Sequence, residues 1–71
     1  MERTLVTSTT LRSVGYDTKD RILELEFTSG AIYQYYGVAE QTHEELLNAE
    51  SLGEYLNYHI KPQGYEYQRI V

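Results

Sequence analysis

Few residues of this 71-residue chain have the types and spacing that catalysis or metal binding needs. His43 and His59 lie on different predicted helices, and without cysteine a metal would have to recruit carboxylates that no spacing brings near. Glu24 and Glu26 could form a carboxylate pair, but solvent-facing residues of a half-buried strand show the same alternation. Ser51 has no base beside it and fits a helix N-cap better than a nucleophile. We therefore expect no enzyme, no metal and no cofactor.

Cations and tyrosines are the residue types that could bind a ligand. Single-stranded RNA is bound by aromatic rings that stack on bases, beside cations that contact phosphates. Three of the arginines fall on three different predicted strands, and would form a basic patch if those strands were neighbours. The alternative is that they are ordinary surface residues. The candidate contacts to RNA or another partner are Arg12, Arg21, Tyr36, Tyr58, Lys61, Tyr67 and Arg69.

The overall charge argues against a general affinity for nucleic acid. Six Lys and Arg stand against eleven Asp and Glu, so the formal net charge is −5. Nonspecific RNA or DNA binding is driven by phosphate neutralisation and usually needs a basic face. The balance favours a protein partner or simple solubility, although a local basic patch is compatible with it.

Length and composition indicate one small domain. The apolar fraction of 41% can build a core, and the absence of cysteine excludes disulfides as a source of stability. No segment reaches the roughly 18 to 20 apolar residues that cross a bilayer, and no secretion signal is evident at the start. We expect a soluble cytoplasmic protein with a loose lead-in over residues 1–7 and a single domain over residues 8–71.

Alternating residues predict three strands in the first half, over residues 8–16, 21–27 and 31–36. The loop Thr28–Gly30 fits a three-residue hairpin turn with glycine in the left-handed position. In that register Leu23 pairs with Tyr35 and Leu25 with Tyr33, so both tyrosines join the apolar face. A two-residue turn would reverse every side chain. We prefer the first register, in which these tyrosines are packing residues with their hydroxyls at the rim.

The second half predicts two helices and a last strand. Residues 38–51 form the first helix, which begins either near Ala39 or at a capping box of Thr42 with Glu45. Ser51 with Glu54 opens a shorter helix, in which Gly53 would permit close packing. Pro62 ends it, and residues 65–71 alternate as a strand. The expected fold is α+β: a small antiparallel sheet in the order β-β-β-α-α-β, with the helices packed on one face.

Four segments together resemble the KTSC domain, a family named for a lysyl-tRNA synthetase C-terminal domain and found also as small bacterial proteins. They are SVGYD (13–17), LELEFTSGAIYQYYGV (23–38), LLNAESLGEYLNYHI (46–60) and YEYQRI (65–70). The residues that match the family's motifs are Tyr33, Tyr35, Ser51, Gly53 and Asn57. Leu52 stands where a basic residue is common, which weakens any phosphate contact carried over from the family.

The resemblance implies a fold and a context more than an activity, and the context is RNA. The first hypothesis is therefore a non-enzymatic binding domain that contacts RNA, tRNA in particular. The alternative is a protein–protein interaction module or a homodimer, because a small sheet with edge strands and exposed tyrosines can pair with another chain. An enzyme ranks last. The sequence leaves the partner and the oligomeric state open.

Overall fold

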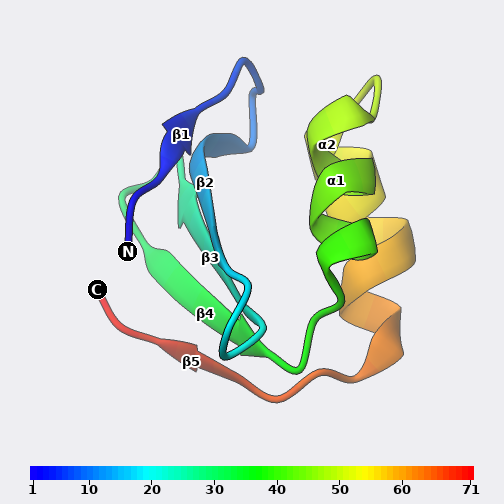
Figure 1. Cartoon of the computed structure of the whole chain (residues 1–71). Helices are drawn as coiled ribbons and strands as arrows, with labels where there is room; N and C mark the ends of the chain where they lie inside the picture. The colour runs from blue at the N-terminus through cyan, green and yellow to red at the C-terminus, as the bar shows by residue number, and fades with distance from the viewer.

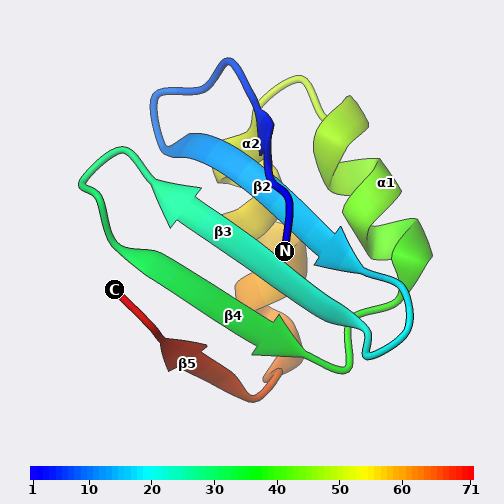
Figure 2. The ribbon, with the colours of Figure 1, turned by 60° about the vertical axis from the view of Figure 1, so that its left-hand side comes forward.

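Five strands form one antiparallel sheet in the computed structural model, which describes residues 1–71. Their order in the sheet is their order in the chain, so the sheet is a simple meander (Figure 2). The strands are β1 (Thr4–Leu5), β2 (Leu11–Asp17), β3 (Ile22–Phe27), β4 (Ile32–Tyr36) and β5 (Tyr67–Arg69).

The helical segments lie together on one face of this sheet, as Figure 1 shows. They are α1 (Glu40–Asn48), α2 (Leu52–Tyr55), a π-helical turn (Leu56–Ile60) and a 3-10 turn (Lys61–Gln63). The predicted α+β architecture is confirmed: antiparallel strands make one layer and helices the other. None of the helices has the length and apolarity needed to span a bilayer.

The β3–β4 hairpin has the predicted register. Leu23 pairs with Tyr35 and Leu25 with Tyr33. The turn is closed by the Phe27 amide, which donates to the Ala31 carbonyl (2.9 Å), and Gly30 has φ 95°. That left-handed conformation is accessible to glycine at little cost, which is why a three-residue loop is stable here. The face with the leucines therefore carries both tyrosines, and it faces the helices.

Strand β2 departs from simple alternation. The register between β2 and β3 shifts between Leu11 and Ser13, so that Arg12 is an extra residue in a β-bulge. A bulge changes which residues face the core. Leu11 and Val14 are consequently both buried in the core, although strict alternation predicts opposite faces.

The chain before β2 is not the loose lead-in that the sequence predicts. Thr4 pairs with Val14 and Leu5 with Ser13, which adds a fifth strand. Gly15 permits this approach, because a Cβ atom at that position would lie 2.6 Å from the Glu2 carbonyl oxygen. The contact between the N-terminal segment and β2 therefore depends on a glycine at this position.

Helix α1 begins directly after Ala39, the simpler of the two predicted starts. The capping box of Thr42 with Glu45 does not form, because the Thr42 amide donates to the Ala39 carbonyl (3.0 Å) within the first turn. Glu45 instead accepts a hydrogen bond from the Tyr55 hydroxyl (2.7 Å), which joins α1 to α2. Burial and then this carboxylate raise the pKa of Tyr55 to about 12.

Ser51 caps α2 as predicted, since its hydroxyl accepts from the Glu54 amide (3.2 Å). Gly53 is buried against the loop before β2, and a Cβ atom there would lie 2.5 Å from Thr10 Oγ1. The predicted close packing is therefore present. Asn57 is exposed on the π-helical turn, and the structure gives its side chain no hydrogen bond.

The helical layer ends near Pro62, as predicted, and Gly64 closes it with φ 73°. A left-handed glycine is a common end for a helix. Strand β5 then pairs with β4, with Tyr67 opposite Tyr35 and Arg69 opposite Tyr33. It is shorter than the predicted strand over residues 65–71.

The core lies between the two layers and contains ten buried hydrophobic residues. The sheet and the chain that leaves β4 contribute one side, and the helical layer contributes the other. The members are Leu11, Val14, Leu23, Leu25, Tyr35 and Val38 on the first side, and Leu46, Leu52, Leu56 and Ile60 on the second. Phe27 and Tyr33 are half-buried beside it, so the core thins towards β5.

Replacing Gly53 with alanine tests the contact between α2 and the loop before β2. Alanine favours a helix by roughly 1 kcal/mol over glycine, but the clash with Thr10 should outweigh this, because overpacking costs about 1–3 kcal/mol. We expect Gly53→Ala to lower the free energy of unfolding, measured by urea denaturation. In a Thr10→Ala background, which removes the nearest atom, the loss should shrink. A higher urea midpoint for Gly53→Ala alone would contradict the packing described.

Candidate functional site

A groove lies between the inner face of the sheet and the end of the helical layer, with a volume of about 790 Å³. We call it the tyrosine groove. Its aromatic lining consists of Phe27, Tyr33, Tyr35, Tyr65 and Tyr67. Two cations, Lys61 and Arg69, and three small residues, Ser29, Ala31 and Gly64, complete the lining. The groove lies where the core thins, at the β5 side of the molecule.

Alternation in two neighbouring strands produces the aromatic wall. Side chains two residues apart on a strand share a face, so Tyr33 and Tyr35 of β4 lie beside Tyr67 and Arg69 of β5. The Tyr35 and Tyr67 ring centroids are 5.5 Å apart, and those of Tyr33 and Tyr67 are 6.0 Å apart. Phe27 meets Tyr33 edge-on at 5.6 Å. The rings thus support one another.

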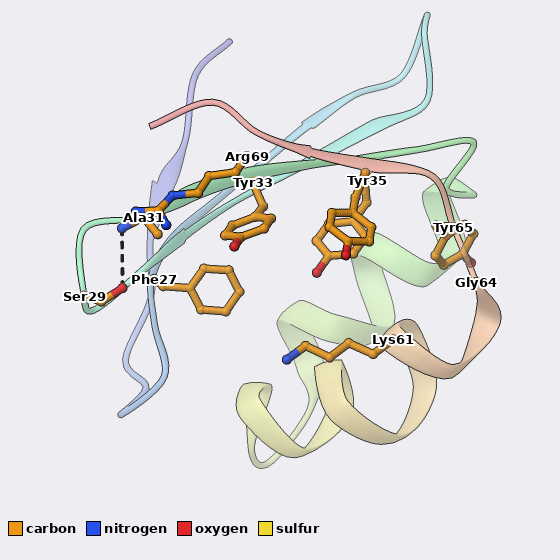
Figure 3. Close-up of a pocket in the computed structure, with 10 residues that line it drawn as sticks. Phe27, Ser29, Ala31, Tyr33, Tyr35, Lys61, Gly64, Tyr65 and Arg69 are labelled. Carbon is orange, nitrogen blue, oxygen red and sulfur yellow. Dashed lines mark hydrogen bonds between the residues drawn. The ribbon is translucent and has the colours of Figure 1, made fainter.

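The polar groups of the groove have few partners within the chain. The hydroxyls of Tyr33, Tyr35 and Tyr67 make no hydrogen bond to the protein, and the chain's single salt bridge involves neither Lys61 nor Arg69. Arg69 donates through Nε to the Val71 carbonyl (2.8 Å). In Figure 3 the Tyr33 and Tyr35 hydroxyls point from the sheet towards the helical layer, along which Lys61 extends.

The Tyr35 phenol stays protonated over a wide pH range. Burial raises its pKa above the usual 10, and the neighbouring Tyr67 and Tyr33 raise it further. The ring is only 6% exposed, so it forms the floor of the groove, whereas Tyr67 is 62% exposed. At neutral pH the hydroxyl is therefore a neutral group that both donates and accepts hydrogen bonds.

Charge is segregated around the groove. Its lining includes two of the six cations of the chain and none of its eleven acidic residues. Such a surface attracts an anion locally although the whole chain is acidic. The arrangement suits a planar ligand that carries negative charge.

Three of the seven sequence-predicted contacts meet at the groove, namely Lys61, Tyr67 and Arg69. Lys61 comes from the 3-10 turn, and the other two come from β5. The condition for a patch of three arginines is not met, because β3 and β4 separate the β2 strand of Arg12 from the β5 strand of Arg69. Arg21 lies in the turn before β3, with φ 56°.

The two remaining predicted contacts lie away from the groove. Tyr58 is 73% exposed on the π-helical turn. Tyr36 lies on the outer face of the sheet, where its hydroxyl donates to Gln34 Oε1 (3.1 Å). Tyr36 is half-buried rather than fully exposed.

The sequence places Tyr33 and Tyr35 on the packing face, and neither Phe27 nor Tyr65 is among the seven candidate contacts, although both line the groove. The packing face is correct, because Tyr35 belongs to the buried core and Tyr33 packs against it. The available signal was the choice of tyrosine over leucine or phenylalanine along an apolar face, because a buried hydroxyl needs a polar neighbour or a groove.

Neither histidine lines the groove, and the two occupy different environments. His43 is half-buried and its ring stacks on Tyr16, with centroids 4.9 Å apart. Burial lowers the pKa of His43, partly offset by Glu44 and Glu40. His59 is exposed beside Tyr55, with ring centroids 4.8 Å apart. No three histidine or acidic side chains come together in the geometry of a metal site.

The outer face of the sheet carries a network of polar side chains, whereas the sequence predicts that Glu24 and Glu26 face solvent. Glu24 is only 4% exposed and forms a salt bridge with Arg3 of the N-terminal segment. Gln34 donates to its second oxygen (2.8 Å). Ser13 accepts from Arg3 Nε (3.0 Å) and donates to Glu26 (2.8 Å). Each carboxylate has structural partners, which explains their burial without catalysis.

These features define a small α+β domain: a five-stranded antiparallel meander, helices on one face, and an aromatic groove at the β5 side. The KTSC domain family model matches residues 7–65, and the chain belongs to this family. The crystal structure of a KTSC domain protein from Yersinia pestis superposes with a TM-score of 0.93 at 34% identity, over 99% of this chain and 97% of that one.

Relatives of two kinds match the sequence. An uncharacterized protein of Stutzerimonas stutzeri is 49% identical over 70 residues, which cover 99% of each chain. A lysine–tRNA ligase of Nostoc is 38% identical over 60 residues, which cover 84% of this chain but 10% of the ligase. The domain therefore exists at the length of this chain and also as a small part of a larger protein.

Acid titration should expose the contribution of Glu24. Burial alone would raise its pKa, but the hydrogen bonds from Gln34 and Arg3, with the charge of Arg3, lower it below the ordinary value of 4.5. A carboxyl whose pKa is lower in the folded than in the unfolded state stabilises the protein at pH values above its unfolded-state pKa. This contribution is lost as the pH falls through the folded-state pKa. We expect Glu24→Gln to be less stable at neutral pH by about 1–3 kcal/mol.

Urea denaturation at pH values above and below 4.5 measures this. Glu24→Gln should lose less stability on acidification than the wild type does. Glu26→Gln, on the same strand face, is the matched control. Its free energy of unfolding should still fall on acidification by the amount that Glu24 contributes. If the free energy of unfolding falls equally with pH in the wild type and in Glu24→Gln, the interpretation is contradicted.

Proposed function

We propose that this chain is a non-enzymatic RNA-binding domain whose contact surface is the tyrosine groove, with tRNA as the partner. The observation that carries the proposal is the groove's composition: five aromatic rings and two cations, with none of the chain's eleven acidic residues. Aromatic rings beside cations suit bases and phosphates respectively.

Similarity to a segment of tRNA ligases supports RNA as the class of partner. The matched segment is 10% of the Nostoc ligase, so it is a small part of that protein. Nothing in the groove resembles a nucleophile with its base or a metal centre. RNA binding therefore fits the groove better than catalysis does. An RNA partner would place the protein in the cytoplasm.

The charge distribution limits how RNA could bind. The chain is acidic overall, which disfavours phosphate, whereas the groove lining has two cations and no acidic residue. Two phosphate contacts on single-stranded RNA would give a slope of about −1.4 in log affinity against log salt concentration. Binding should be modest in strength and confined to one face.

Removing the two groove cations should weaken tRNA binding. We expect Lys61→Gln with Arg69→Gln to bind at least about tenfold less tightly than wild type at low salt, because each bond to a charged group contributes about 1.5–3 kcal/mol. Fluorescence anisotropy with labelled tRNA measures the affinity and its salt slope. The matched control, Arg12→Gln with Lys19→Gln, removes the same charge from outside the groove and should change affinity less than about threefold.

Two outcomes would contradict the proposal. If wild type gives no anisotropy change with tRNA at low salt, RNA is not the partner. If both double variants lose affinity equally, the effect is general electrostatics and the groove has no special role.

The free edge of β5 supports a second candidate, self-association. The Tyr36 amide donates to the Glu66 carbonyl (2.9 Å) and the Ile70 amide to the Ile32 carbonyl (2.8 Å). Backbone groups along an antiparallel strand point alternately to its two sides, so those of Tyr67 and Arg69 point away from β4. They form an unpaired edge to which another strand can add. Light scattering over a range of concentrations tests this: we expect a mass that rises towards the dimer, and a constant monomer mass would argue against it.

A further inference from the structure

We infer that the tyrosine groove takes one unpaired nucleobase, which stacks on Tyr67, while the phosphates on either side of it are held by Lys61 and Arg69. The inference rests on the proposed function and specifies its ligand as single-stranded RNA. Duplex RNA, with its bases already paired and stacked, cannot supply such a base.

The size of the groove fits a single nucleotide. Its volume of about 790 Å³ lies in the range of roughly 300–1,000 Å³ that sites for small ligands occupy. It is a single groove beside a three-residue strand rather than an extended track. An RNA double helix could touch the mouth but could not enter.

Exposure separates the roles of the aromatic rings. Tyr35 is 6% exposed and has no free face, so it can serve only as the floor. Tyr67 is 62% exposed and is backed by the rings of Tyr35 and Tyr33, at 5.5 and 6.0 Å between centroids. The Tyr67 ring is therefore largely exposed but held beside two tilted neighbours, at interplanar angles of 31° and 41°. Because these neighbours restrict its movement, little conformational entropy is lost when a base stacks on it.

The polar groups at the groove then match the remaining parts of a nucleotide. The hydroxyls of Tyr33 and Tyr35 can each donate to a base carbonyl or accept from a base amino group, so they satisfy any base without choosing strongly among them. Lys61 and Arg69 extend from opposite walls, one helical and one sheet (Figure 3), and both are exposed. They are therefore placed to contact the backbone on the two sides of an inserted base.

Stacking on Tyr67 predicts a specific pattern among variants. Tyr67→Phe keeps the ring and should bind a single-stranded oligouridylate within about threefold of wild type. Tyr67→Leu removes the ring and should weaken binding by about fivefold or more, given the roughly 1–3 kcal/mol measured for one stacked base. Tyr58→Leu removes an exposed tyrosine outside the groove and is the matched control, expected to change nothing.

The experiment compares single-stranded oligouridylate with a blunt oligouridylate–oligoadenylate duplex of the same length, by anisotropy. NMR follows the tyrosine ring signals, and circular dichroism checks that each variant is folded. We expect single strand over duplex by at least about tenfold, and a shift of the Tyr67 ring signals on binding.

Duplex binding as tight as single-strand binding would overturn the inference, as would equal losses in Tyr67→Leu and Tyr58→Leu. Either result could occur while tRNA binding still depends on Lys61 and Arg69, and then only this inference fails. If no RNA of any kind binds, the proposed function fails with it.

Discussion

The pairing of β3 with β4 determines where nearly every other part of this domain lies. Gly30, in its left-handed conformation, closes a three-residue loop, and the loop length sets Leu23 opposite Tyr35 and Leu25 opposite Tyr33. A shift of one residue would turn these side chains to solvent and bring Glu24 to the core. The helices can cover the sheet only because this face is apolar, and the groove exists because the same face ends in tyrosines.

The two faces of the sheet meet their polar requirements in different ways. On the outer face Glu24 is buried, and Arg3, Gln34 and neighbouring side chains satisfy its oxygens within the chain. On the inner face the tyrosine hydroxyls and Lys61 are left without protein partners. Polar groups that are hydrogen-bonded within the chain contribute to structure, whereas solvent-accessible groups that border a groove without a protein partner are available to a ligand. This contrast is why the inner face, rather than the more heavily charged outer face, carries the proposed site.

Stability in so short a chain depends on close approach between segments. There are no cysteines and the core has ten buried hydrophobic residues, so each contact matters. Gly15 lets the N-terminal segment lie on β2, and Gly53 lets α2 lie against Thr10. The first of these contacts brings Arg3 to Glu24. Because these contacts stabilise the domain at the side of β1 and β2, a groove can remain at the β5 side, where the hydrophobic core is thin.

Local pattern in the sequence was enough to predict the β3–β4 register, the packing face of Tyr33 and Tyr35, the Ser51 cap and the α+β class, because each depends on neighbours within a few residues. It also brought Lys61, Tyr67 and Arg69 into the set of candidates. Tertiary structure decided the rest: the bulge at Arg12, the burial of Glu24 by Arg3, and the separation of Arg12 from Arg69 across the sheet. These depend on strand order and on contacts between segments distant in sequence, and no local periodicity encodes which strands become neighbours.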